Sequence, residues 1–284
     1  MKDIKRRIKS VKSTKQITKA MELVASSKLR HAKEKADNVR PFFDSLYELM
    51  WEISSENSTF NSIFTSTRAH HSTLVIVIAG DRGLAGGFNT NVLKLAEERC
   101  TELTKAGGIV SVLPIGMKAV EYFEKRQYKL AYKYQNIAEH LKIYGAAEIA
   151  EKIIEAYRQG KIDRVELVFT NYVSQLIQEA RHMSVLPVEN IGGNDKTIKA
   201  QTTYEPSPQV VFDRLIPKYV AGILYGAIVD SFASEQAARR TAMESASDNA
   251  DEMIGDLELL YNRARQATIT QELTEIVGGA SAQA

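Results

Sequence analysis

A glycine-rich segment, Gly80-Asp-Arg-Gly-Leu-Ala-Gly-Gly-Phe-Asn89, comes closest in residue types and spacing to a ligand-binding site. It follows the apolar run Leu74–Ala79, and an α/β sheet places its phosphate-binding loops directly after such a buried strand. The dinucleotide fingerprint needs glycines at offsets zero, two and five, and a P-loop must end in Gly-Lys-Ser/Thr. The segment has neither pattern. We therefore expect a tight backbone turn at a partner interface rather than a nucleotide cradle.

No other group of residues has the spacing of a catalytic or metal-binding site. The five histidines have no i, i+4 companion and no CxxC partner, which argues against metal ligation. Cys100 is the single cysteine, so an internal disulfide is excluded, and no His or Asn partner is implied for it. Asp248, Asp251, Glu252 and Asp256 recur at helical spacing, which a solvated coiled-coil flank explains better than a metal site. We expect no catalytic residue, metal or cofactor.

Positive charge is concentrated at one end of the chain. Residues 1–40 hold 13 Lys or Arg against 4 Asp or Glu, although the whole 284-residue chain has a formal net charge of only +2. This asymmetry predicts an acidic partner for the N-terminal segment. Because no aromatic residue precedes Pro41 and no DNA-binding motif accompanies the charge, we favour an acidic protein surface over nucleic acid.

Two long helices that pair with each other are predicted at the ends, over residues 1–58 and 208–284. In the first segment, small and apolar residues recur from Ile4 to Val39 at steps of about four and three, the spacing of a coiled-coil seam. Pro41 is expected to bend or interrupt this helix near Val39. The last segment keeps the same spacing unbroken from Val229 to Thr268. An antiparallel intramolecular coiled coil is the simplest way to cover both seams.

The middle segment, residues 72–200, predicts an α/β domain. Short β-branched runs indicate strands, and they alternate with stretches of helical spacing. The expected strands lie near 74–79, 109–115, 164–171 and 180–188, and the expected helices near 91–106, 117–125 and 146–158. Such alternation implies βαβ units, so we expect a Rossmann-like fold with a mostly parallel sheet. Residues 190–209 are expected to link this domain to the last helix.

The two ends and the centre of the chain also carry long motifs. The C-terminal pattern is Ile269-Thr270-x-Glu272-x-x-Glu275-x-x-x-Gly279-Ala280-x-Ala282. The other motifs are the N-terminal run from Ile4 to Arg30, the loop Gly83–Asn89, Tyr204-Glu-Pro206, and Ala233–Arg239. Together they resemble the γ subunits of F-type ATP synthases, and the C-terminal pattern is similar to the signature of that family at every defined position. No cysteine-bearing insertion like that of chloroplast members is present, which favours the bacterial type without a thiol switch.

The resemblance implies a central rotor shaft rather than an enzyme. In that family the paired terminal helices enter the axial cavity of a ring of α and β subunits. The α/β domain stays below with the ε subunit, on the membrane c-ring. ATP chemistry takes place in the β subunits, and asymmetric contacts of the shaft couple ion-driven rotation of the c-ring to ATP synthesis or hydrolysis.

Partner-contact residues are implied by the same resemblance. The contacts with the acidic lever loops of β are Met21, Lys28 and Arg239. An upper contact with a β loop is implied for Arg265, Gln266, Thr270 and Glu272. A lower contact with the α/β ring is implied for Gly83, Gly86, Gly87 and Asn89. The foot near the c-ring and ε is implied for Tyr204 and Glu205.

The resemblance further implies partners and location. The partners are the α, β and ε subunits and the c-ring, with one copy of this chain per complex and no nucleic acid. No apolar signal region follows the basic N-terminus, and the longest apolar run is far too short to cross a bilayer. The chain is therefore expected at the cell membrane as a peripheral protein on the cytoplasmic side, attached only through the c-ring.

Two other classes of function compete with the rotor shaft. A nucleotide-binding α/β enzyme with coiled-coil dimerisation arms would need phosphate affinity at Gly80–Asn89. A coiled-coil nucleic-acid binder would show steeply salt-dependent DNA binding.

Overall fold

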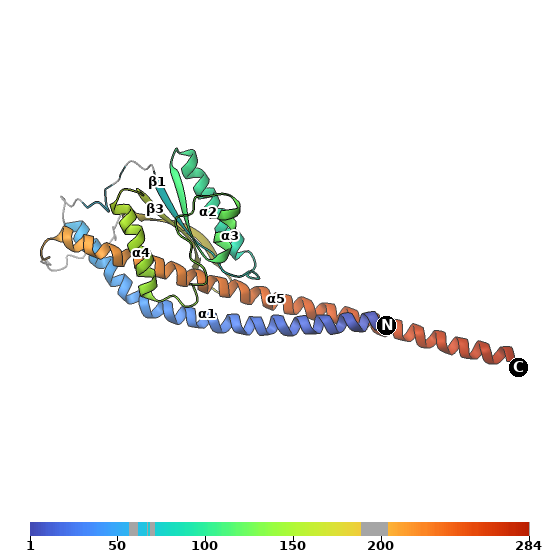
Figure 1. Cartoon of the computed structure of the whole chain (residues 1–284). Coiled ribbons are helices and arrows are strands. Elements are labelled where there is room, and N and C mark those ends of the chain that lie inside the picture. Colours follow the sequence, from blue (N-terminus) through green and yellow to red (C-terminus); the bar gives the residue numbers. More distant parts are fainter. Residues whose placement is uncertain (57–61, 67, 69–71, 189–203, 284) are drawn as a thin grey trace. The chain divides into compact units, whose positions relative to one another are not determined.

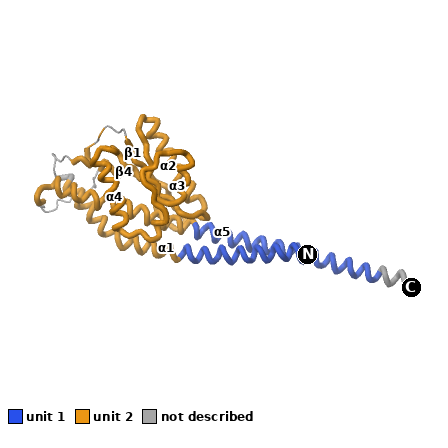
Figure 2. Tube along the Cα trace, viewed as in Figure 1, with its two compact units in different colours: residues 1–26, 239–284 blue, residues 27–238 orange. Residues whose placement is uncertain are grey.

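The computed structural model describes residues 1–56, 62–66, 68, 72–188 and 204–283. Its elements in chain order are α1 (Lys2–Glu56), β1 (Ser72–Ile78), α2 (Phe88–Lys105), β2 (Ile109–Ile115), α3 (Met117–Lys125), α4 (Ile143–Arg158), β3 (Arg164–Tyr172), β4 (Gln178–Leu186) and α5 (Pro208–Gln283) (Figure 1). The chain divides into two compact units, residues 1–26 with 239–284 (unit 1) and residues 27–238 (unit 2) (Figure 2).

Unit 1 is a pair of antiparallel helices, the N-terminal part of α1 and the C-terminal part of α5. Lys12 Nζ lies 2.8 Å from Glu258 Oε1, and the Thr18 and Ser247 hydroxyls share a hydrogen bond of 2.7 Å. As the α1 number rises the α5 number falls, which defines the antiparallel direction. The seam positions predicted from the spacing are the inward ones: the buried residues here are Thr18, Ala25, Met243, Ser247, Ala250 and Ile254, with Arg239 beside them.

Pro41 does not interrupt α1, which is helical without a break from Lys2 to Glu56. An internal proline costs a helix about 3 kcal/mol because it removes one N–H and crowds the preceding turn. The residues that follow it, Leu46, Met50 and Ile53, are buried in the core of unit 2. Burial of three large apolar side chains contributes about 1.5–3 kcal/mol each, which outweighs the proline. Tertiary packing therefore keeps the helix continuous where local propensity would end it.

Unit 2 contains a four-stranded sheet in the order β2-β1-β3-β4. β1 pairs in parallel with β2 and β3, while β4 pairs antiparallel with β3, so the expected mostly parallel α/β sheet is confirmed. The antiparallel edge has a simple cause. Only residues 173–177 connect β3 to β4, and a parallel return would need a crossover of a dozen or more residues.

Helices cover both faces of the sheet (Figure 1). On one face, alternate strand residues such as Ile76 and Leu167 pack against α4 and against the parts of α1 and α5 that belong to unit 2. On the other face, Val75 and Val168 pack against α2 and α3. The strands are apolar on both faces, as strands buried between helices must be.

Gly116, between β2 and α3, permits a close backbone approach. Its φ is +98°, and a Cβ there would lie 2.0 Å from the carbonyl oxygen of Ala79. Only glycine tolerates both the left-handed conformation and the contact. The end of β2 is thereby held against the residues that follow β1.

The three predicted helices of the α/β domain are present; α3 has the predicted bounds, and α2 and α4 have shifted ends. α2 begins at Phe88, three residues before the expected start, and α4 begins at Ile143. Of the expected linker 190–209, residues 190–203 lie outside the described residues. α5 contains an 18-residue window with a mean hydropathy of 1.3, apolar enough to cross a membrane by length and composition, but 56% of that window is buried within the protein. The core helix of a soluble domain has the same character.

Candidate partner-binding sites

The α5 helix of unit 1 exposes large apolar side chains near its C-terminal end. Every residue from Ile269 to Val277 is exposed, and Ile276 is 68% exposed. Two of the expected contact residues, Thr270 and Glu272, lie on this stretch, and Arg265 and Gln266 are exposed just before it. Exposed apolar side chains in a row mark an interaction surface more often than a solvated one. The structure thus presents all four residues of the expected upper contact to the outside.

Around the helix pair of unit 1, other apolar side chains also face outward. Ile17, Leu23 and Val24 of α1 are exposed, as are Met253, Leu259 and Leu260 of α5. The seam between the two helices is already filled by smaller residues, and these side chains remain more than half exposed. Unit 1 has one apolar surface inside the pair and a second one outside it.

Met21 and Arg239, both expected to meet acidic loops, differ in exposure. Met21 is half-buried, so part of its side chain is accessible from outside unit 1. Arg239 is only 9% exposed, which leaves little of the side chain for contact with another subunit. Sequence spacing could not separate the two, because both positions lie close to the seam.

Lys28, the third residue of that expected contact, forms an ion pair inside unit 2. Its Nζ lies 2.7 Å from Glu139 Oε2, and Lys35 Nζ donates to the backbone oxygen of Glu139 at 2.9 Å. The hydrogen bond from Lys28 lowers the pKa of the Glu139 carboxyl below its ordinary value. α1 is therefore clamped to the loop before α4, and the Lys28 ammonium is partly neutralised.

The loop Gly80–Asn89 is held by its own polar side chains. Asn89 Oδ1 accepts a hydrogen bond from Gly80 N at 2.8 Å, and Asn89 Nδ2 donates to Arg82 O at 3.1 Å. Asp81 Oδ1 accepts from Met117 N and from Asn136 N, both at 2.9 Å. The amides of Gly80 and Met117 thus already have acceptors, and a carboxylate occupies the N-terminus of α3. An incoming phosphate would meet a negative charge there.

The outer part of this loop is exposed. A Cβ added at Gly83 or Gly86 would meet nothing within 4 Å, and Gly86 has a φ of +53°. Gly87 precedes the first residue of α2 as its N-cap. Leu84 is exposed and has a left-handed φ of 62°. A non-glycine residue in that conformation with an apolar side chain in solvent is unusual, and strain of this kind concentrates at functional sites.

Sequence reasoning missed a second exposed apolar surface on unit 2, the hairpin tip between β3 and β4. Val173 and Ile177 are exposed there, and Leu176 is 80% exposed. Because β1 and β3 are parallel, this tip and the loop Gly80–Asn89 follow the same carboxyl edge of the sheet. The signal was present in the sequence: a tight turn with three apolar residues is atypical, since turns favour Gly, Asn, Asp and Pro.

Tyr204 and Glu205, expected at the foot, begin the described chain after the gap and directly precede α5. Tyr204 is half-buried and packs against the main core of unit 2, whereas Glu205 is exposed. The described residues contain no group of three or more His, Cys, Asp or Glu arranged to hold a metal ion.

Comparison with known proteins identifies the family of the chain. The family model described as ATP synthase matches residues 1–283. A curated protein from Ruminococcus albus, the ATP synthase gamma chain, is 60% identical over 276 residues, which cover 97% of this chain and 96% of the relative. The chain belongs to the family of ATP synthase gamma chains. The sodium-ion-specific ATP synthase gamma chain of Acetobacterium woodii is 42% identical and covers 99% of this chain and 98% of its own length.

Solved structures share the architecture of this gamma chain. A chain of the Tetrahymena thermophila mitochondrial ATP synthase, in a structure of the central stalk and c-ring, aligns with a TM-score of 0.63 at 27% identity and covers 81% of this chain and 99% of its own. A chain of the Euglena gracilis mitochondrial enzyme aligns with a TM-score of 0.67 over 99% of this chain and 94% of its own, at 17% identity. The second likeness concerns the fold alone.

Proposed function

We propose that this gamma chain is the central rotor shaft of an F-type ATP synthase, coupling rotation of an ion-driven c-ring to ATP synthesis and hydrolysis on other subunits. One observation carries the proposal beyond family membership: unit 1 exposes large apolar side chains around a helix pair whose own seam is already filled. Large exposed apolar surfaces mark interaction sites, and a partner chain would remove this one from water. A ring of subunits with an axial cavity would cover it on all sides.

The coupling follows from unequal contacts. A helix pair has different side chains on its different faces, so it contacts three equivalent ring subunits unequally. A shaft can shift the conformational equilibrium of a subunit only by contacting one of its states more favourably than another. Turning the shaft by one third of a circle exchanges those biases among the three subunits. The resulting order of states is what links rotation to the chemistry of ATP.

We infer that the shaft is non-catalytic and that its partners are α, β, ε and the c-ring, with one copy in each complex. The backbone amides of Gly80 and Met117 support this inference. Both already donate hydrogen bonds to side chains of the protein, so the glycine-rich loop is poorly suited to hold phosphate. The membrane-bound complex would hold this chain peripherally on the cytoplasmic side, through the c-ring alone.

The contacts that we assign divide by unit. In unit 1 the partner-binding residues are Met21, Arg265, Gln266, Thr270 and Glu272. Arg239 is also assigned to this contact, although its side chain is largely buried. In unit 2 they are Gly83, Gly86, Gly87 and Asn89, the ion-paired Lys28, and the foot residues Tyr204 and Glu205. Exposed ion pairs contribute only about 0–1 kcal/mol each, so charged contacts of this kind exchange readily as the shaft turns.

The purified chain is expected to hydrolyse no ATP, and to restore ATP-driven ion pumping when it is reassembled with α, β and ε on c-ring membranes. Stoichiometric ATPase from the pure chain would contradict the proposal. Titration with ATP followed by calorimetry tests the rival nucleotide enzyme on the same sample. Saturable binding that disappears in an Asn89→Ala variant would favour the rival.

Met21→Lys is expected to impair coupling more than assembly. The substitution places a cation on a half-exposed position next to the acidic loops that we assign as partners, which strengthens one rotary state over the others. The ratio of ions pumped to ATP hydrolysed should fall, with a normal yield of the assembled complex. Met21→Leu is the matched control, because it keeps an apolar side chain of similar volume. Equal coupling in both variants would remove Met21 from the contact.

A further inference from the structure

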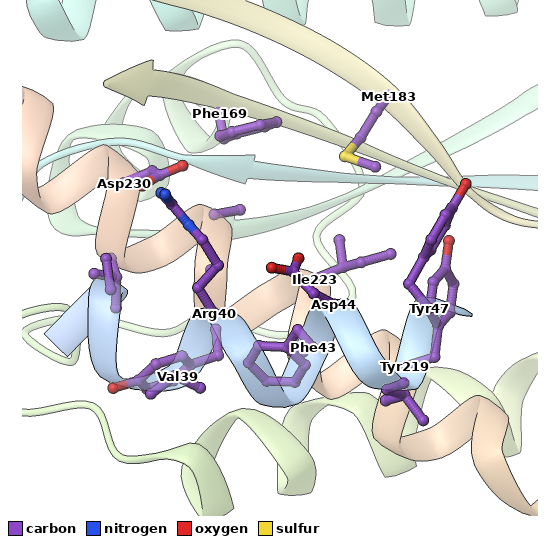
Figure 3. Close-up of a pocket in the computed structure, with 17 residues that line it drawn as sticks. Val39, Arg40, Phe43, Asp44, Tyr47, Phe169, Met183, Tyr219, Ile223 and Asp230 are labelled. Atoms are coloured by element: carbon purple, nitrogen blue, oxygen red, sulfur yellow. The ribbon is translucent and has the colours of Figure 1, made fainter. Parts of the chain in front are cut away.

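A cavity of about 340 Å3 lies inside unit 2, and nothing in the rotor function uses it. It is bounded by α1, α5 and the sheet face of β3 and β4, and it opens to the surface (Figure 3). Phe169 of β3 and Met183 of β4 form the sheet side of the cavity, and Phe43 of α1 and Ile223 of α5 face them. Its walls include buried residues, whereas Arg40, Asp44 and Tyr47 are exposed and form a mouth.

The absence of a side chain at Gly226 leaves space in the apolar part of the cavity. Two glycines of α5 line it, Gly222 and Gly226. A Cβ at Gly222 would lie 2.1 Å from Phe43 Cε1, so Phe43 packs directly on that stretch of backbone. A Cβ at Gly226 would meet nothing within 4 Å. The empty volume therefore extends over Gly226, where almost any other helical residue would occupy part of it.

The lining of the cavity contains more acidic than basic side chains. Asp230 and Asp44 supply two carboxyl groups, and Arg40, which reaches toward Asp230 in Figure 3, supplies the one cation of the lining. Within the described part of the chain, the Asp230 carboxyl accepts no hydrogen bond, and no cation forms an ion pair within 4 Å of it. Burial raises the pKa of Asp230, and the charge of Arg40 only partly offsets this. A second positive charge at Asp230 would stabilise its carboxylate.

We propose that this cavity binds a small amphipathic cation, an aryl- or alkylammonium ion whose apolar body lies between Phe43, Phe169 and Met183 and whose ammonium group meets Asp230. The size follows from scaling. An apolar cavity of about 150 Å3 holds one benzene, so this cavity holds a body of about 10–14 heavy atoms. Ligand sites of about 300–1,000 Å3 are typically apolar with a few oriented polar groups, which is the composition found here.

A bound ligand would join three elements that carry the shaft. It would contact α1, α5 and the β3–β4 face together, so it would stabilise the folded form over the unfolded chain in proportion to its concentration above its Kd. The inference does not depend on the rotor function: the site concerns packing within unit 2 alone.

The test uses the purified full-length chain and two probes of one shape, 4-phenylbutylammonium and 4-phenylbutanol. Calorimetry should show the ammonium binding at least about tenfold more tightly than the alcohol, since hydrogen bonds to charged groups are the stronger ones. Asp230→Asn should remove that difference and leave the affinity for the alcohol unchanged. Gly226→Leu, which fills the cavity, should abolish binding of both probes, with Gly226→Ala as a milder variant that weakens both.

Each alternative outcome overturns the proposal. Equal affinities for the two probes in the wild-type chain, or no binding of either, would show that the cavity does not select cations. Unchanged affinity in both Gly226 variants would place the probes elsewhere on the chain. Thermal unfolding of every variant, followed by circular dichroism, verifies that a loss of binding is not a loss of fold.

Discussion

Ala250→Asp is expected to uncouple ATP hydrolysis from ion pumping in the assembled complex. Ala250 is 6% exposed and lies on the α5 side of the seam in unit 1. A carboxylate at this position would be buried between two helices, at a cost of about 3 kcal/mol or more. The helix pair would loosen locally, and a loosened pair cannot transmit torque from the globular unit to the ring.

Asn249→Asp is the matched control for this substitution. It adds the same charge one residue earlier, where the side chain is exposed. Vesicles that contain each complex are assayed for ATP-driven ion uptake and for ATPase rate. We expect the Ala250 variant to lose uptake and retain hydrolysis, and the Asn249 variant to keep both. Normal uptake in the Ala250 variant would mean that the seam of unit 1 does not carry the torque.

Glu166→Gln is expected to destabilise the folded chain by about 3 kcal/mol, because it removes a buried carboxylate that pairs with two arginines. Glu166 is 1% exposed and lies on β3, on the sheet face that α2 covers. Arg99 of α2 reaches it with two hydrogen bonds, 2.7 Å from Nε to Oε2 and 2.8 Å from Nη2 to Oε1. Arg164 Nε lies 2.9 Å from Oε1, close enough for an ion pair but without hydrogen-bond geometry.

The matched control for this variant is Glu102→Gln, because Glu102 also pairs with Arg99. Glu102 pairs with Arg99 Nη1 at 2.9 Å, but its side chain is 65% exposed. Exposed pairs contribute about 0–1 kcal/mol, so Glu102→Gln should change the free energy of unfolding little. Urea denaturation followed by circular dichroism compares the two variants with the wild type. Equal losses would show that burial of the Glu166 carboxylate adds nothing to its interaction with Arg99.

The same pair predicts a pH dependence. Burial raises the pKa of Glu166, but the Arg99 hydrogen bonds and the charges of Arg99 and Arg164 outweigh it and lower the pKa below its ordinary value. A lowered pKa in the folded state stabilises the fold above the unfolded value, about 4.3 for Glu, and that stability is lost as pH falls through the folded pKa. The difference in unfolding free energy between wild type and Glu166→Gln should therefore be full near neutral pH and shrink below about pH 4.

Much of the fold could be predicted because the relevant signals are local. Met243, Ser247 and Ala250 are buried where their spacing of four and three placed them, since a 3.5-residue period states which side of a helix faces a partner. The β-branched runs around Val75 and Val168 became central strands for the same kind of reason. The exception, continuous helix through Pro41, arises where packing outweighed a local preference.

The candidate sites were predictable only in part. Exposure of Thr270 and Glu272 accords with the expected contact, and the motif that marked them is contiguous in sequence. Lys28 and Glu139 are 111 residues apart in the sequence, and no pattern in either segment predicts that they pair. The burial of Arg239 and the exposure of Leu176 likewise depend on which elements pack nearby, and spacing carries no such information.

By itself the sequence determined the two long helices, their seam, the alternating α/β segment and the family to which the chain belongs. These properties follow from periodicity and contiguous motifs, which act over a few turns of backbone. Tertiary structure alone decided the antiparallel edge strand, the buried Glu166–Arg99 pair, the apolar hairpin tip and the cavity over Gly226. Each of these depends on the volume and charge that distant segments bring together, because side-chain packing and desolvation are set by neighbours in space rather than along the chain.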